Sequence, residues 1–149
     1  MTEIQALLLI KSILESADIH GIENILAEDC EYMSTGRGII GRNRNESIEF
    51  LSSMTESIKA DNVPVTCKVM HITDVYEEDA LFHEGRHGLT VSYESGDNYV
   101  YMIFVDVNDE GLVDRIVSSQ ENYSIEYDDL RFGDDESEYA FISAPTTVK

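Results

Sequence analysis

Three histidines are the side chains of this chain best suited to acid–base chemistry. His71, His83 and His87 fall on the more apolar face of two segments whose alternating polarity predicts β-strands. An imidazole titrates near neutral pH, so a histidine that lines a cavity could take up and return a proton. His87 and His83 are therefore the candidate catalytic residues. The alternative is that the three histidines lie at strand ends or are hydrogen-bonded in the core.

Two tyrosines and a serine could share a cavity with these histidines. Tyr32 and Ser34 lie on one face of a predicted strand over residues 30–35, and Tyr101 shares a face of the strand 99–105 with Tyr99. A tyrosine offers a large apolar body and a polar tip, which suits a ligand site or a dimer interface as well as an ordinary core. The predicted ligand-binding set is Tyr32, Ser34, His83, His87 and Tyr101. The histidine spacing matches no zinc site, so we expect no metal and no cofactor.

The elements that would position these residues can be predicted from periodicity and capping residues. Thr2 and Gln5 have the form of a capping box, and Asn43 with Glu46 has the same form. Glycine and asparagine mark turns at 94–98 and 108–111. The expected helices begin at residue 2 and end near 17, cover 22–27, and run from 43 to a stop at 61–64. The expected strands cover 30–35, 65–76, 80–93, 99–105 and 112–127.

The chain is strongly acidic, and this excludes some classes of partner. Ten Lys and Arg residues against thirty Asp and Glu give a formal net charge of −20 at pH 7. A negative surface repels nucleic-acid phosphates and anionic membranes, so neither is expected as a partner. Arg37, Arg42 and Arg44 form the one basic cluster noted in the sequence, which could attract an anionic ligand to the mouth of a pocket or form exposed ion pairs.

The length of 149 residues fits one domain with one substantial core. Residues 1–127 are expected to form this domain, and 128–149 an acidic, partly disordered C-terminal extension. Cys30 and Cys67 are too few for a disulfide framework and are expected as buried thiols. The N-terminus does not resemble a signal peptide, and the apolar run 6–10 is too short to span a bilayer, so a cytoplasmic location is expected.

Two stretches carry a resemblance to a known superfamily. The residues NILAEDCEYMS at 24–34, followed by Gly41 and ESIEFL at 46–51, are similar to the start of the nuclear-transport-factor-2-like superfamily. The residues YMIFVDVNDEGLVDRI at 101–116 resemble its last hairpin. This superfamily includes SnoaL-type polyketide cyclases, ketosteroid isomerases and scytalone dehydratases. The resemblance covers about residues 3–125 and rests on element order and hydrophobic pattern.

The resemblance implies an α+β fold: three N-terminal helices packed on a curved, mainly antiparallel sheet, which together form a cone-shaped α+β roll. It also implies a homodimer formed through the sheet. Ketosteroid isomerases carry their general base, an aspartate, on the first strand, whereas Ser34 stands at that position here. Serine cannot remove a proton from carbon without a base of its own, so this departure favours binding over isomerase chemistry.

The leading functional prediction is a small-molecule-binding protein whose partly apolar pocket takes an apolar or aromatic ligand. One alternative is an enzyme of the cyclase, dehydratase or isomerase type, in which His87 or His83 acts as base and Tyr32 orients the substrate. Another alternative is a protein-interaction module of the inhibitor or immunity type, whose acidic surface binds a basic protein.

Overall fold

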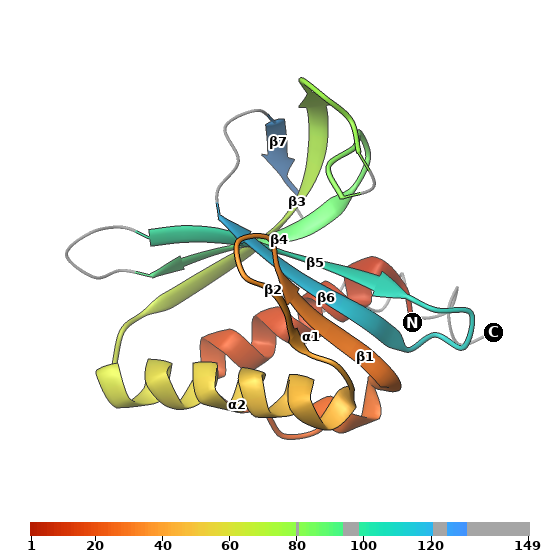
Figure 1. Cartoon of the computed structure of the whole chain (residues 1–149). Coiled ribbons are helices and arrows are strands. Elements are labelled where there is room, and N and C mark those ends of the chain that lie inside the picture. Colours follow the sequence, from red (N-terminus) through yellow and green to blue (C-terminus); the bar gives the residue numbers. More distant parts are fainter. Residues whose placement is uncertain (80, 94–98, 121–124, 131–149) are drawn as a thin grey trace.

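In the part of the chain that the structure describes, a seven-stranded sheet carries two α-helices on one side (Figure 1). The computed structural model describes residues 1–79, 81–93, 99–120 and 125–130. The helical elements are α1 (Glu3–Ser16), a 3₁₀ turn (Ile22–Asn24) and α2 (Arg44–Asp61). The strands are β1 (Leu26–Ser34), β2 (Gly38–Gly41), β3 (Val65–Val75), β4 (His87–Tyr93), β5 (Tyr99–Val107), β6 (Val113–Gln120) and β7 (Ile125–Asp129).

The strands follow the order β2-β1-β6-β5-β4-β3-β7 across the sheet. All pairings are antiparallel except that of β1 with β6, which is parallel and joins the two halves of the sheet. Helix α1 packs against β3, β4 and β5, and α2 packs against β1 and β2. The predicted α+β class with a curved, mainly antiparallel sheet is therefore confirmed, and Figure 1 shows both helices on the same side of it.

The prediction of three helices is wrong, because the described chain has two α-helices and one short 3₁₀ turn. The segment expected as a helix over 22–27 leaves helical geometry after Asn24. The backbone carbonyl of Ile25 accepts from the amide of Val113 at 2.8 Å, and Leu26 is already opposite Val113 in the β1–β6 pair. Pairing with a distant strand therefore takes Leu26 and Ala27 into β1.

Both predicted helix starts are confirmed. Thr2 and Gln5 form a full capping box, in which each side chain accepts a hydrogen bond from the backbone amide of the other residue. The Asn43 side chain accepts from the amide of Glu46 at the start of α2. The Glu46 carboxylate accepts from the amide of Arg42 rather than from that of Asn43, so the second box is shifted by one residue.

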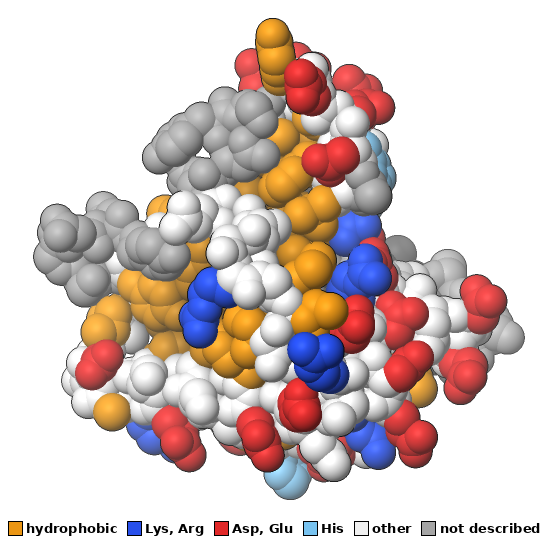
Figure 2. Space-filling view, in the orientation of Figure 1, with side chains coloured by type: hydrophobic (Ala, Val, Ile, Leu, Met, Phe, Trp, Pro, Cys, Tyr) orange, Lys and Arg blue, Asp and Glu red, His pale blue; other side chains and the backbone are white. Residues whose placement is uncertain are grey.

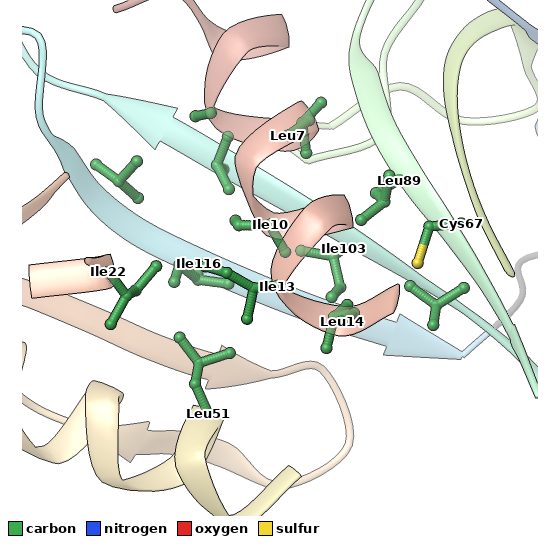
Figure 3. Packing of buried hydrophobic residues seen from close by; sticks show 14 of the residues in the cluster. Leu7, Ile10, Ile13, Leu14, Ile22, Leu51, Cys67, Leu89, Ile103 and Ile116 are labelled. Atoms are coloured by element: carbon green, nitrogen blue, oxygen red, sulfur yellow. The ribbon is translucent and has the colours of Figure 1, made fainter. Parts of the chain in front are cut away.

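The main core lies between the helices and the concave face of the sheet. Figure 3 shows Leu7, Ile10 and Leu14 of α1 directed toward the strands, with Leu51 approaching from α2. The strand residues labelled there with them are Cys67, Leu89, Ile103 and Ile116. A second, smaller cluster covers the opposite face and consists of Met70, Ile72, Met102, Phe104 and Ile125. Strand β5 therefore has apolar packing on both of its faces, which is typical of a central strand.

Two predicted strands differ from the observed ones. The strand expected over 80–93 begins only at His87, because Gly85 has a positive φ of 83° and the amide of Arg86 bonds to the carbonyl of His83 in a turn. The long strand expected over 112–127 corresponds to β6 and a separate β7, which pairs with β3 at the far edge of the sheet. The first part of the expected acidic extension thus joins the sheet, and 131–149 lie outside the described residues.

No helix within the described ranges is long and apolar enough to cross a membrane.

Candidate functional site

A cavity of about 550 Å³ opens between α2, the β1–β2 hairpin and the adjoining ends of β4, β5 and β6. Its apolar lining consists of Tyr32, Ile40, Phe50, Met54, Tyr93 and Tyr101. Its polar lining consists of Ser34, Thr35, Arg37, Ser118, Ser119 and Gln120, with Gly36 between them. Figure 2 shows hydrophobic side chains gathered in the hollow just above α2.

The apolar wall is built from two pairs of aromatic rings. Tyr32 on β1 lies against Phe50 on α2, with 4.6 Å between the ring centroids. Tyr93 on β4 and Tyr101 on β5 are stacked at 5.7 Å, and their hydroxyl oxygens are 3.0 Å apart. Such ring pairs stabilise one another beyond simple burial, so they give the wall a defined shape.

The two buried tyrosines keep their protons at neutral pH. Burial raises the pKa of Tyr32 to about 12, although a hydrogen bond with Ser118 acts in the opposite direction. Burial also raises the pKa of Tyr101, and the hydrogen bond to Tyr93 adds to the effect. Protonated phenols at these positions can donate hydrogen bonds but are poor bases. Tyr32 already points its hydroxyl at the Met54 sulfur, 3.7 Å away, which is a weak acceptor that a ligand oxygen could replace.

Strand alternation explains why Tyr32 and Ser34 meet in this cavity. Residues two apart on a strand share a face, and β1 is buried on that face at Cys30 and Tyr32. Ser34 is opposite Ser118 in β6 and opposite Gly38 in β2, at the end of β1. The polar residues of the lining therefore gather at the ends of β1 and β6 and in the turn between β1 and β2.

Arg37 supplies the one charged side chain of the lining among the described residues. It lies in the turn between β1 and β2, is exposed, and has no carboxylate within ion-pair distance in the described parts of the chain. In a chain with a net charge of −20, a cation without such a partner at a cavity mouth favours an anionic or strongly accepting group on a ligand.

The structure brings Tyr32, Ser34 and Tyr101 together but leaves His83 and His87 outside the lining of the cavity. His87 is on the same face of β4 as Tyr93 but six residues away, which is about 20 Å along a strand. There its Nδ1 is 2.9 Å from a carboxylate oxygen of Glu3 at the start of α1.

His83 and His71 also lie away from the cavity. His83 lies in the turn before β4, where its Nδ1 is 3.1 Å from the carbonyl of Glu84. His71 is opposite His87 on β3 and borders a different hollow beside β7. No three His, Cys, Asp or Glu side chains in the described segments converge as a metal-binding group.

Several lining residues were not singled out from the sequence. Phe50 and Met54 are four residues apart on α2, and this i,i+4 spacing indicates that the two apolar side chains are neighbours on one face of the helix. Tyr93 is on the same face of β4 as Leu89 and Val91, which marks it as a cavity-side residue. No local sequence pattern identifies Ser118, Ser119 and Gln120 as lining residues. They reach the cavity because β6 pairs in parallel with the distant strand β1.

Comparisons with known proteins agree with the fold. No family model matches the sequence, and no curated protein sequence matches it either. Among solved structures, a Silicibacter pomeroyi protein with a cystatin-like fold is 15% identical at a TM-score of 0.55, covering 82% of this chain and 78% of that one. A nuclear-transport-factor-2-like protein of Mesorhizobium loti is 12% identical at a TM-score of 0.55, with coverages of 80% and 93%.

A third similar structure is SalBIII, an epoxide hydrolase/cyclase-like enzyme in pyran ring formation of the polyether salinomycin. It is 13% identical at a TM-score of 0.53 and is covered over 93% of its length, against 83% of this chain. Identities this low carry information about architecture and none about chemistry. The chain therefore has the nuclear-transport-factor-2-like, or cystatin-like, fold.

Proposed function

We propose that this protein reversibly binds a small, largely apolar molecule that carries a hydrogen-bond acceptor, and that it does so in the cavity above α2. The observation that carries the proposal is the aromatic wall formed by Tyr32, Phe50, Tyr93 and Tyr101 around a space of about 550 Å³. Ligand sites typically combine an apolar lining of about this size with a few polar groups that fix orientation.

The lining favours binding over acid–base catalysis. Among its described residues there is no carboxylate and no histidine, and Tyr32 has a pKa too high for a base at neutral pH. The enzyme alternative relied on His87 or His83 as a base, and both lie outside this lining. The Tyr32 hydroxyl, the serines at the strand ends and the Arg37 guanidinium suit a ligand oxygen as acceptor.

A thermal-shift screen against a metabolite library tests the proposal. A ligand at 100 times its dissociation constant stabilises the folded state by about 2.7 kcal/mol, which raises the unfolding midpoint of a chain this size by about 5–10 °C. We expect the hits to be apolar molecules with an oxygen acceptor.

Two neighbouring isoleucines of β2 provide a matched pair of variants. Ile40 lines the cavity, whereas Ile39 points away from it and is 44% exposed. Ile40→Trp fills part of the space and should weaken each hit at least tenfold, whereas Ile39→Trp should leave it unchanged. The proposal would be refuted if the library gives no hits, or if the hits bind the Ile40→Trp variant as tightly as the native protein.

A further inference from the structure

A second hollow of about 370 Å³ continues the cavity along α2. It is lined by Val63, Tyr93 and six residues of α2, which are Phe50, Ser53, Met54, Ser57, Ile58 and Asp61. Three of its side chains, those of Phe50, Met54 and Tyr93, also line the first cavity. The two hollows therefore meet at these three residues and share them as a common boundary.

Helix geometry places the two hollows one after the other along α2. Phe50, Met54, Ile58 and Asp61 follow each other at spacings of four, four and three residues, so they lie along one side of α2. The distance from Phe50 to Asp61 along the helix axis is about 16 Å. The floor is apolar at Phe50, Met54 and Ile58, and Ser53 and Ser57 form the outer rim.

The groove has opposite charges at its two ends. Arg37 lies at the mouth of the first hollow, and Asp61 closes the second. Neither side chain takes part in an ion pair with another described residue. An anionic group is thus attracted to the Arg37 end and repelled from the Asp61 end, which fixes one orientation for an elongated anion.

We infer that the two hollows together bind an unbranched, long-chain aliphatic monocarboxylate. The carboxylate pairs with the Arg37 guanidinium, and the chain runs over Phe50 and Met54, past Tyr93, into the second hollow. This inference rests on the proposed function of the first cavity and names the class of its ligand. A flexible chain suits the groove because it can bend at the shared boundary, where the unbranched Met54 side chain can adapt its shape.

Isothermal titration with hexanoate, octanoate, decanoate and dodecanoate, each kept below micelle formation, tests the inference. Each buried methylene should tighten binding by about threefold to fourfold, so dodecanoate should bind far more tightly than octanoate. Arg37→Gln should weaken every member of the series and reduce the salt dependence of binding.

Two substitutions on α2 separate the groove from nonspecific attachment to the surface. Ser57→Phe fills the second hollow and should remove the gain from the longest chains while octanoate binding stays unchanged. Ala60→Phe is the matched control, because Ala60 is exposed on the same helix and lines neither hollow. It should keep the full dependence on chain length.

The possible failures can be told apart. The extended groove would be refuted if carboxylates bind through Arg37 but their affinity does not rise with chain length. It would also be refuted if the affinity rises with chain length equally in the Ser57→Phe variant. In both cases the first cavity would remain a ligand site. Library hits of another class with no carboxylate binding would overturn the choice of ligand. An absence of binding by both the library and the carboxylates would overturn the inference together with the proposed function.

Discussion

Replacing Ser47 by alanine tests what holds α2, one wall of the cavity, against the sheet. Ser47 is fully buried, and its hydroxyl donates a 2.9 Å hydrogen bond to the backbone carbonyl of Cys30. Cys30 lies in the irregular stretch of the β1–β6 pairing between Leu26 and Glu31, where the regular ladder is interrupted. The serine hydroxyl therefore serves as hydrogen-bond donor to a carbonyl at a gap in the sheet.

The expected loss of stability follows from leaving that carbonyl buried without its donor. An orphaned buried acceptor costs about 1–3 kcal/mol. Alanine favours the helix over serine by about 0.5 kcal/mol, which offsets part of the loss. We therefore expect Ser47→Ala to lower the free energy of unfolding by about 0.5–2.5 kcal/mol, which is about 1–10 °C in the unfolding midpoint for a chain of this size.

Urea unfolding followed by circular dichroism measures this change, with a lower midpoint and an unchanged slope as the expected result. Ser53→Ala is the matched control on the same helix, because the Ser53 hydroxyl donates to the Glu49 carbonyl at an exposed position. The control should be as stable as the native protein or slightly more so. Equal midpoints for the two variants would refute the reasoning, and packing of Leu51 and Ile58 alone would then hold α2 in place.

Three further predictions concern groups with defined surroundings. Thr2→Ala removes the Thr2 side chain from the α1 capping box and should lower the free energy of unfolding, measured by thermal unfolding, by about 1 kcal/mol. Thr2→Ser keeps the hydroxyl and should keep the stability, so equal losses in the two variants would contradict the role of the cap. Burial raises the pKa of Cys30 to about 12, so in a Cys67→Ser background this thiol should react with a disulfide reagent at pH 8 only after unfolding, and rapid labelling of the native protein would contradict its burial. Tyr32 has a pKa of about 12 when folded and about 10 when unfolded, so the unfolded chain loses its proton first. The stability that this difference provides is complete below pH 10 and falls as the pH rises from 10 to 12; Tyr32→Phe should lessen this fall in urea midpoints, and an identical fall would refute the assignment.

The features that could be predicted from the sequence are those that depend on near neighbours. The Thr2 cap and the Asn43 cap require only residues three positions away, and both are present. Period-two alternation placed Tyr32 and Ser34 on one face of β1, and both line the cavity. Tyr101 was assigned to a cavity on the same argument, and it also lines it.

The histidines show what alternation cannot supply. Alternation identifies the face of a strand but not the position along it, so His87 shares a face with Tyr93 and yet lies at the opposite end of β4, beside Glu3. For His83 the predicted strand itself was wrong, because Gly85 adopts a positive φ and a turn stands where the strand over 80–93 was expected to continue. Which residues meet across the cavity depends on pairings between distant segments, and no local pattern contains these.

The parallel pairing of β1 with β6 has a consequence for the synthesis of the chain. The ribosome makes β1 and the helices α1 and α2 first, whereas β6, which lies between β1 and β5 in the finished sheet, is made only after both of these strands. Until β6 emerges, the edge of β1 that pairs with it has no partner strand, and the β2–β1 pair cannot join β5, β4 and β3. Contacts between such distant segments slow folding, and the incomplete chain exposes strand edges to other molecules. This protein therefore depends most on protection from aggregation in the interval before Val113 to Gln120 leave the ribosome.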